Sequence, residues 1–355
     1  MPSATLNINL SALAANYNLL KERHSKNNVA AVVKADAYGL GVREISLRLQ
    51  KEGCEDFFVA TLDEAIELRN ILPLANIGVF QGILAGEKEE YIKHNLIPVL
   101  NILSQLNDFI WIIENNQNIK PIIHIDTGMT RLGLSQSDLS YPALQTFREE
   151  SSVTIMSHLA CADNPEHPKN NEQLQRFKQA VGFFNNTKTS LANSAGIFLD
   201  KEFHFDMARV GCALYGISPS VGGNPMRHVA TLTAPILQIR ELDRDESIGY
   251  GATVSLAKGK KIAIAALGYA DGYFRNLGNK GTVHIAGHKA PVIGRVSMDM
   301  VAIDLSEVPI SMINYDSVVE FINENYSVND LAADSGTIGY EVFTHIGNRV
   351  KRVYY

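Results

Sequence analysis

Short apolar runs recur along the first two thirds of the chain, separated by longer polar or amphipathic stretches. The runs are apolar throughout rather than alternating, which is typical of strands buried on both faces of a parallel sheet. The stretches between them carry helix signals. TLDEAIELRNIL, residues 61–72, begins with Thr61 and Glu64 at capping-box spacing, and NEQLQRFKQAVGFF, residues 171–184, repeats apolar residues at helical intervals. The predicted strands are 29–33, 57–60, 76–80, 97–100, 121–125, 153–158, 189–193 and 207–211.

Eight strands alternating with helices over about 200 residues are typical of a closed (β/α)8 barrel of the TIM type. An open doubly wound sheet is the alternative. The chain has no GxGxxG fingerprint, however, and the lone GLG at residues 39–41 is weak evidence for one. The pattern therefore predicts an α/β fold whose first domain, residues 8–225, is a barrel.

The pattern changes at GISPSVGGNP, residues 216–225, where Gly, Pro and Ser cluster as they do at domain boundaries. The following runs are β-branched and separated by turn residues, which predicts a second, mostly β domain over 226–355. A single helix is expected near VNDLAADSG, residues 328–336. Residues 1–7 belong to a stretch that alternates cleanly, and they could add a strand to the second sheet. The predicted strands of this domain lie within 229–242, 260–267, 282–287 and 316–322.

Composition narrows the class of protein. The chain is 46% hydrophobic and 20% charged, as an ordinary globular protein is, and its net charge is −6. With no basic excess to neutralise phosphates, nucleic acid is not an expected partner. The basic tail NRVKRVYY, residues 348–355, is interpreted as a last strand with solvated basic residues rather than as a nucleic-acid-binding arm.

The cysteines and the termini suggest a cytoplasmic protein. Cys54, Cys161 and Cys212 are far apart and lack metal-ligand spacing, so reduced thiols are expected rather than disulfides or a metal site. The first residues do not resemble a signal peptide. No apolar stretch approaches the roughly 20 residues of a membrane helix, so no membrane partner is expected.

Candidate chemistry gathers at the carboxyl ends of the predicted barrel strands, which share one mouth where active sites form. A lone lysine or histidine at such a position is usually structural, but several polar groups converging on one mouth favour a functional site. An amine close to arginines is also more easily kept neutral, as a lysine that forms a covalent bond to a carbonyl group must be. The residues at these ends are Lys34, Arg131, His158, Asn193, Ser194, Arg209 and Gly211.

A set of motifs along nearly the whole chain resembles the alanine racemase family of pyridoxal phosphate enzymes. In order, they are AVVKADAYGLG, HIDTGMTRLG, MSHLACAD, LANSA, ARVGCALYG, GYGATV, GYADGYFR, VIGRVSMDM and GTIGYE. The resemblance implies a barrel with a C-terminal β domain, pyridoxal 5'-phosphate as cofactor, no metal, and alanine as substrate. It also implies a head-to-tail homodimer in which the partner subunit completes each active site.

The resemblance assigns the cofactor residues. Lys34 is expected to carry the cofactor covalently, and Arg209 to face its pyridine nitrogen. His158 is expected to bond Arg209, and Arg131 to bond the cofactor's phenolic oxygen and help hold the substrate carboxylate. The expected phosphate residues, which include backbone N–H groups, and the other cofactor-binding positions are Tyr38, Asn193, Ser194, Gly211, Cys212 and Asn348.

The remaining assignments concern the second domain and the reaction. Racemisation removes a proton from one face of Cα and returns one to the other, so two acid–base groups are expected: Lys34 and Tyr250 of the partner subunit. A tyrosine needs assistance to act as a base, and the expected His158–Arg209 pair would supply it. Met298 and Asp299 are expected to shape the substrate pocket. Asp163, Tyr269 and Arg275 are expected to line its entrance.

Two positions differ from the family pattern. His124 occurs where many members have a lysine modified to a carbamate, which histidine cannot form, and its role is left open. Asn348 is aligned with a tyrosine that crowds the substrate pocket in many members. An amide there would leave room for a hydroxyl, so some serine racemisation is expected beside alanine.

Two other functions are weighed against an alanine racemase. An amino-acid decarboxylase of the same fold would place a cysteine in the second domain, whereas all three cysteines precede residue 226. A non-catalytic pyridoxal phosphate carrier would lack the β domain and Tyr250. Whether the chain supplies D-alanine for peptidoglycan precursors or degrades alanine is left open.

Overall fold

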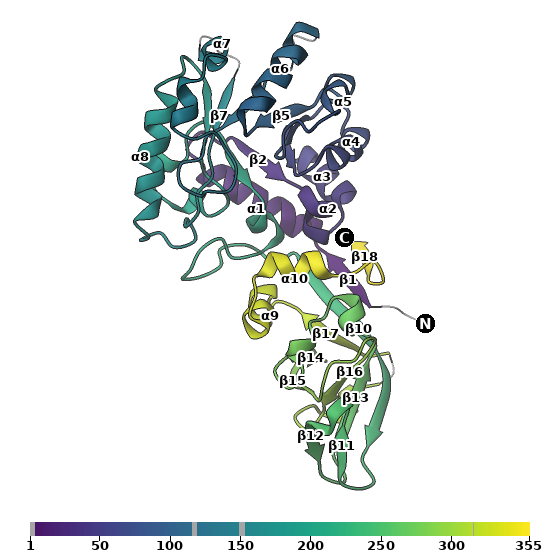
Figure 1. The fold of residues 1–355 in the computed structure, drawn as a ribbon. Helices are drawn as coiled ribbons and strands as arrows, with labels where there is room; N and C mark the ends of the chain where they lie inside the picture. The colour runs from purple at the N-terminus through teal and green to yellow at the C-terminus, as the bar shows by residue number, and fades with distance from the viewer. Residues whose placement is uncertain (1–3, 116–118, 149–152, 315) are drawn as a thin grey trace.

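The computed structural model describes residues 4–115, 119–148, 153–314 and 316–355, and it forms two domains joined near residues 216–229. Figure 1 shows the helix-covered first domain above the β-rich second domain, with α9 (Val328–Ser335) and α10 (Gly339–His345) between them. Within the described ranges, no helix is long and apolar enough to cross a membrane.

The first domain is a barrel of parallel strands, as predicted. Its strands follow the order β8-β7-β6-β5-β4-β3-β2-β9. The ends of this sheet meet where the Arg209 N–H donates to the carbonyl of Ala192 at 2.9 Å. The strands are β2 (Val29–Val32), β3 (Asp56–Val59), β4 (Asn76–Val79), β5 (Ile97–Leu100), β6 (Ile122–His124), β7 (Thr154–Met156), β8 (Lys188–Ser190) and β9 (Ala208–Val210).

Side chains of the barrel strands alternate between two cores. Ala30 and Val32 of β2 pack with Phe58, Val99, Ile122 and Met156 inside the barrel, while Ala31 and Val33 join the core beneath the helices. The capping box predicted at Thr61 and Glu64 is present at the start of α4. The helices of this domain are α1 (Leu10–Arg23), α3 (Val42–Lys51), α4 (Leu62–Ile71), α5 (Lys88–Lys93), α6 (Leu103–Asn115), α7 (Leu144–Arg148) and α8 (Lys169–Val181). The short element α2 (Lys34–Gly39) has a left-handed backbone over residues 35–38.

The second domain is a mostly antiparallel sheet in the order β13-β16-β15-β14-β17-β10-β1-β18, with a further pairing between β13 and β10. The first strand of the chain, β1 (Thr5–Ile8), lies between β10 and the last strand, β18 (Lys351–Tyr354), so both chain ends belong to this sheet. The other strands are β10 (Ala230–Glu241), β13 (Lys261–Ala265), β14 (Thr282–Ile285), β15 (His288–Ile293), β16 (Val301–Asp304) and β17 (Val318–Ile322), with a separate hairpin of β11 (Glu246–Ile248) and β12 (Val254–Leu256).

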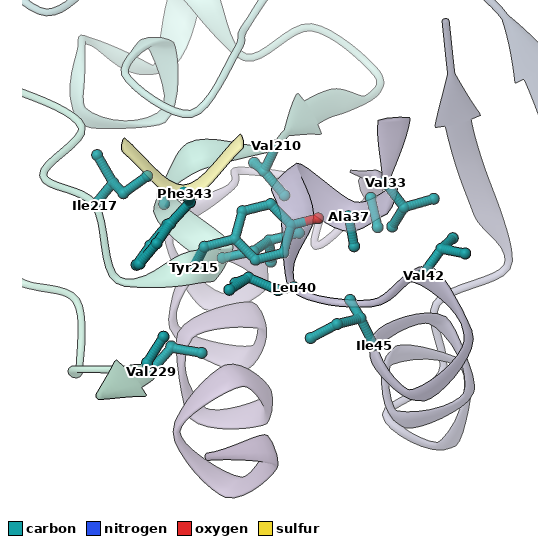
Figure 2. Packing of buried hydrophobic residues seen from close by; sticks show 14 of the residues in the cluster. Val33, Ala37, Leu40, Val42, Ile45, Val210, Tyr215, Ile217, Val229 and Phe343 are labelled. Carbon is teal, nitrogen blue, oxygen red and sulfur yellow. The ribbon is translucent and has the colours of Figure 1, made fainter. Parts of the chain in front are cut away.

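Two expectations for this domain need correction. The predicted single helix is α9, but Gly336 ends it in the left-handed region and a second helix, α10, follows. The tail forms the expected strand β18, but Arg352 is half-buried, and its guanidinium donates to backbone carbonyls. Figure 2 shows Phe343 of α10 packed beside Tyr215 and Leu40 of the barrel domain, so the two domains share a core.

Candidate active site

A cavity of about 730 Å³ opens at the carboxyl ends of the barrel strands, with α9 and α10 forming part of its wall. It brings together every barrel residue that the sequence singles out, and two wall residues, Gly339 and Tyr340, come from α10. The predicted residues on its wall are Lys34, Tyr38, His124, Arg131, His158, Asp163, Asn193, Ser194, Arg209, Gly211 and Cys212.

Lys34 directly follows the buried strand β2 and is half-buried at the cavity. Its Nζ lies 5.9 Å from the centroid of the Phe80 ring, which in turn stacks on Phe58. Burial and the nearby positive charge of Arg131 lower the pKa of the amine below the usual 10.5, while Glu64 opposes the shift. The neutral, nucleophilic form of Lys34 is therefore more populated than that of an ordinary exposed lysine.

A left-handed turn follows Lys34 and places Tyr38 on the same wall. Residues 35–38 have φ values of 51–60°, and none of them is glycine. This conformation costs roughly 1–2 kcal/mol per residue for L-amino acids, so the surrounding contacts must hold it. Such strain is typical of functional sites.

Arg209 of β9 is a buried arginine with one polar atom unused. Its Nη1 donates to Ser190 Oγ and its Nη2 to the carbonyl of Ser157, but its buried Nε has no hydrogen-bond partner. A buried donor without an acceptor costs about 1–3 kcal/mol, so a ligand with an acceptor atom is expected at this position.

Ser194, Tyr38 and the start of the 3-10 helix Cys212–Tyr215 form a cup of hydroxyls and backbone N–H groups. Ser194 Oγ accepts from the N–H of Gly211 at 3.0 Å and of Ala213 at 3.4 Å. A Cβ on Gly211 would lie 2.3 Å from the Tyr38 hydroxyl, so only glycine allows this approach. Hydroxyls and N–H groups clustered in this way are suited to a phosphate.

The geometry fixes the tautomer of buried His124. Asn101 donates its amide Nδ2 to the carbonyls of Phe80 and Val99, both at 2.9 Å, which leaves Oδ1 facing His124 Nδ1 at 2.8 Å. Nδ1 therefore carries the proton, and the acceptor lone pair is on Nε2. Burial and the charges of Arg209 and Arg131 lower the pKa of His124 to about 4, so the ring is neutral.

The loop that carries Arg131 is held by Asp126. The Oδ1 atom of Asp126 accepts from the N–H groups of Gly128, Met129 and Thr130 at 2.8, 2.9 and 3.1 Å. The Asp126 N–H donates to the carbonyl of Leu134 at 2.9 Å and closes the loop. The motif HIDTGMTRLG thus makes a short rigid loop that brings the exposed Arg131 to the cavity wall.

His158 and Asn193 line the cavity but are bonded differently from expectation. Within the described part of the chain, no hydrogen bond joins the side chains of His158 and Arg209, and the Arg209 Nη atoms donate to Ser190 and Ser157 instead. Burial and nearby Arg209 hold the pKa of His158 well below its usual value. Asn193 donates to the carbonyl of Leu159 and accepts from the N–H of Gly196, so both its polar atoms shape the loop.

The candidate residues of the second domain lie elsewhere. Tyr250 is 70% exposed, and the hairpin strands β11 and β12 that flank it lie at the end of the domain far from the barrel (Figure 1). Arg349 pairs with Asp271 and Asp299 at 3.0 and 2.8 Å and fixes the Asp299 loop beside Tyr269. The candidate residues of this domain that lie outside the chain's own cavity are Tyr250, Tyr269, Arg275, Met298, Asp299 and Asn348.

The expectation for Asn348 needs correction. Asn348 is exposed and lies outside the cavity, whereas Tyr340 lines it, with its ring centroid 6.4 Å from that of Tyr38 in an edge-to-face arrangement. The tyrosine that lines the cavity is therefore Tyr340, and Asn348 does not take its place. The signal was present in the motif GTIGYE, which contains this tyrosine. Asn101, the partner of His124, had no sequence signal.

The residues fit pyridoxal phosphate. A lysine with a lowered pKa suits the aldehyde carbon, the unpartnered Nε of Arg209 suits the ring nitrogen, and the cup at Ser194 suits the phosphate. Among the described residues, no group of three or more His, Cys, Asp or Glu side chains could hold a metal ion. A barrel with such a site and an appended β domain defines a class of pyridoxal phosphate enzymes.

Comparison with known proteins narrows the class. The alanine racemase N-terminal domain model matches residues 8–219, and the alanine racemase C-terminal domain model matches residues 229–354. The alanine racemase of Rickettsia canadensis is 42% identical and aligns over 100% of this chain and 99% of its own length. That of Rhizobium meliloti is 39% identical over 99% of this chain and 97% of its own length.

Solved structures agree. The crystal structure of alanine racemase from Bartonella henselae with covalently bound pyridoxal phosphate has a TM-score of 0.93 and 34% sequence identity, with 100% of each chain covered. The chain therefore belongs to the alanine racemase family, a family of pyridoxal phosphate-dependent isomerases.

Proposed function

We propose that this chain interconverts L-alanine and D-alanine, with Lys34 both carrying pyridoxal phosphate and exchanging a proton on one face of Cα. The observation that carries the proposal is the half-buried amine of Lys34, with its lowered pKa, on the same cavity as the unpartnered Nε of Arg209. An amine in this state is a nucleophile before the cofactor binds and a base once the substrate has displaced it.

The cofactor would lie between these two residues. Arg209 would face the ring nitrogen, and the hydroxyls of Ser194, Tyr38 and Tyr340 with the N–H groups of Gly211 and Cys212 would hold the phosphate. When bound to the substrate amine, pyridoxal phosphate withdraws electrons and acidifies the Cα proton. A guanidinium has no proton acceptor, so Arg209 would keep the ring nitrogen unprotonated and limit this withdrawal. This restraint would disfavour side reactions such as transamination.

The second acid–base group is proposed to be Tyr250 of the partner subunit. Two faces of Cα must be reached, and the described chain brings no tyrosine of its β domain other than Tyr340 to the cavity wall. Tyr250 is exposed beside glycines, in a region where an aromatic side chain this exposed suits an interface. We therefore propose a homodimer in which the β domain of each chain completes the other chain's site.

Arg131 and His124 would orient the substrate. The Nε2 atom of His124 accepts hydrogen bonds and lies on the same wall as the guanidinium of Arg131. A neutral acceptor there would hold Arg131 without neutralising it, so the full positive charge stays available to a substrate carboxylate. We do not propose serine racemisation, because Asn348, whose amide was expected to leave room for the serine hydroxyl, does not line the cavity.

The function is tested by incubating the purified protein, loaded with pyridoxal phosphate, with L-alanine and separately with D-alanine. Chiral chromatography should show D-alanine formed from L-alanine and L-alanine formed from D-alanine. Both reactions should approach an equal mixture, since enantiomers have equal free energies. Release of CO2 with no D-alanine would favour a decarboxylase, and no turnover of either enantiomer would favour a non-catalytic carrier. Either result would overturn the proposal.

A further inference from the structure

We propose that Arg352 and Tyr354, on the last strand of the chain, are positioning residues that hold the left-handed turn behind Lys34. The importance of this turn to catalysis rests on the proposed function, but the contacts themselves do not. Both residues belong to the second domain and reach the turn through the carbonyls of Gly39 and Leu40.

The barrel domain holds the turn through backbone N–H groups at its start and through Asp36, which also accepts from Gly41 and Val42 at its end. The N–H of Ala35 donates to Glu64 Oε1 at 2.8 Å, and the N–H of Ala37 donates to the carbonyl of Val33 at 2.9 Å. The carboxylate of Asp36 accepts from the N–H of Val42 at 2.6 Å. Glu64 is anchored in turn at the start of α4, so this side of the turn is tied to the barrel.

The second domain holds the end of the turn. Arg352 Nε and Nη2 both donate to the carbonyl of Gly39, at 3.2 and 3.0 Å. Tyr354 Oη donates to the next carbonyl, that of Leu40, at 3.0 Å. Gly39 has a φ of +82°, and a Cβ on it would lie 2.5 Å from the carbonyl oxygen of Phe343. The turn and the second domain are therefore in direct backbone contact.

The same guanidinium fixes the segment that follows α10. Nη2 donates to the carbonyl of Ile346 at 2.6 Å, and Nη1 donates to those of Gly347 and Val350 at 2.6 and 2.8 Å. One side chain thus sets the distance between the Lys34 turn and α10, which carries Tyr340. Figure 2 shows the apolar side of this contact, where Ala37 and Leu40 lie near Phe343 and Tyr215.

These contacts explain how a strained turn can persist. Left-handed conformations at four successive non-glycine residues relax unless both ends are fixed. β18 fixes the carbonyls of Gly39 and Leu40. Without these bonds the carboxyl end of the turn would depend on the bonds that Asp36 accepts from Gly41 and Val42, and it should open more often. Lys34 and Tyr38, at opposite ends of the turn, would then lose their common orientation toward the cavity.

Hydrogen–deuterium exchange on the cofactor-loaded protein tests the inference. Arg352→Met keeps the aliphatic stem but removes every donor, and Lys351→Met is the matched control on the same strand, where Lys351 is exposed. The N–H groups of Ala37 and Gly41, bonded to Val33 and Asp36, report on the turn. Arg352→Met should speed exchange over residues 35–41 about tenfold relative to the control, with α8 unchanged.

Tyr354→Phe removes a single donor and is the variant most certain to fold. It should change the same peptide in the same direction, by about threefold. Arg352→Lys, which keeps one charged donor, should lie between the control and Arg352→Met, and it replaces Arg352→Met if that variant does not fold. Release of the cofactor on dialysis should follow the same rank order, with a shifted absorption band of the bound cofactor.

The inference is wrong if residues 35–41 exchange at the same rate in Arg352→Met as in the control Lys351→Met. Where Arg352→Lys replaces Arg352→Met, the same comparison applies to it. An increase that is equally large in α8 would also overturn the inference, because that would be a general loss of stability. The exchange readout does not depend on the role of Lys34. If the proposed function fails, faster exchange still supports the role of Arg352 and Tyr354 in holding the turn, and only the cofactor readout is lost.

Discussion

The barrel mouth and the second domain contribute to the site in opposite ways. Every candidate residue from the barrel lines one cavity, and buried Arg209 there has a donor without a partner. The second domain supplies Tyr340 to that cavity, whereas Tyr250, Met298 and Asp299 are exposed on its surface away from it. In the proposed function, one chain therefore supplies the residues that hold the cofactor, and a second chain supplies part of the substrate site.

The difference shows how two domains of one chain can serve different parts of a site. The cofactor side needs preorganised donors, and the closed barrel supplies them on strand ends that cannot move independently. The substrate side needs groups on the opposite face of Cα, which the same barrel cannot easily reach. A second domain that packs on its own barrel through α10 and β18, yet leaves Tyr250 exposed, is suited to complete another copy.

The largest effect is expected from Lys34→Ala, which breaks the cofactor side of the comparison. The variant should fold and dimerise but lose the absorption band of covalently bound cofactor and at least about a thousandfold in racemisation rate. Absorption spectra after dialysis and chiral assays check this. Lys51→Ala, at an exposed position on α3, is the control and should retain both. A Lys34→Ala protein that keeps the band and turns over would contradict the assignment.

A smaller effect is expected from Arg131→Met, which tests how charge at the barrel mouth sets the pKa of Lys34. Arg131 disfavours the protonated form of Lys34, so its removal should raise the pKa of Lys34 toward the usual 10.5. The rate at which the apoprotein captures pyridoxal phosphate rises as the amine loses its proton. The pH profile of capture should therefore shift to higher pH in the variant.

Glu64→Gln should shift the pH profile of cofactor capture in the opposite direction. Glu64 raises the pKa of Lys34, so its removal should shift the capture profile to lower pH, while a glutamine can still serve in the capping box. Shifts of the same sign in both variants would show that charge at the mouth does not set the state of Lys34.

The smallest effect concerns the stability of the barrel in acid. The unfolded chain binds a proton at His124 near pH 6.5, but burial holds the folded-state pKa at about 4, so folding stability falls as pH drops through this window. The loss attributable to His124 is at most about 3 kcal/mol. His124→Gln should flatten the dependence of unfolding free energy on pH between these values, measured by denaturant titration. His167→Gln, at an exposed position, gives the baseline, and identical slopes would contradict the account.

Much of the fold was visible in the sequence because of how it is buried. The barrel strands lie between an inner and an outer core, so each is a continuous apolar run, and all eight predicted runs are strands. The helix α10 was missed, because Tyr340, Val342 and Phe343 near its start have side chains typical of strands. Its helical form depends on packing against the barrel domain.

The site was visible to a similar extent. Residues at the ends of parallel strands converge whatever the loops do, so Lys34, Ser194 and Arg209 were predictable from order alone. Tyr340 and Arg352 act across the contact between domains, and local spacing carries no sign of it. Arg352 in particular has the sequence pattern of a solvated tail residue, yet two of its bonds go to the carbonyl of Gly39, which lies near it only in the folded chain.

The central claim, that each site is shared by two chains, is tested most directly by hybrid dimers of Lys34→Ala and Tyr250→Phe. Each parent alone should be nearly inactive in at least one direction. Random re-association of equal amounts makes half of the dimers hybrids with one intact site, so about a quarter of wild-type activity should return. Native mass spectrometry that shows hybrids, together with activity no higher than the parents', would contradict a site built across the interface.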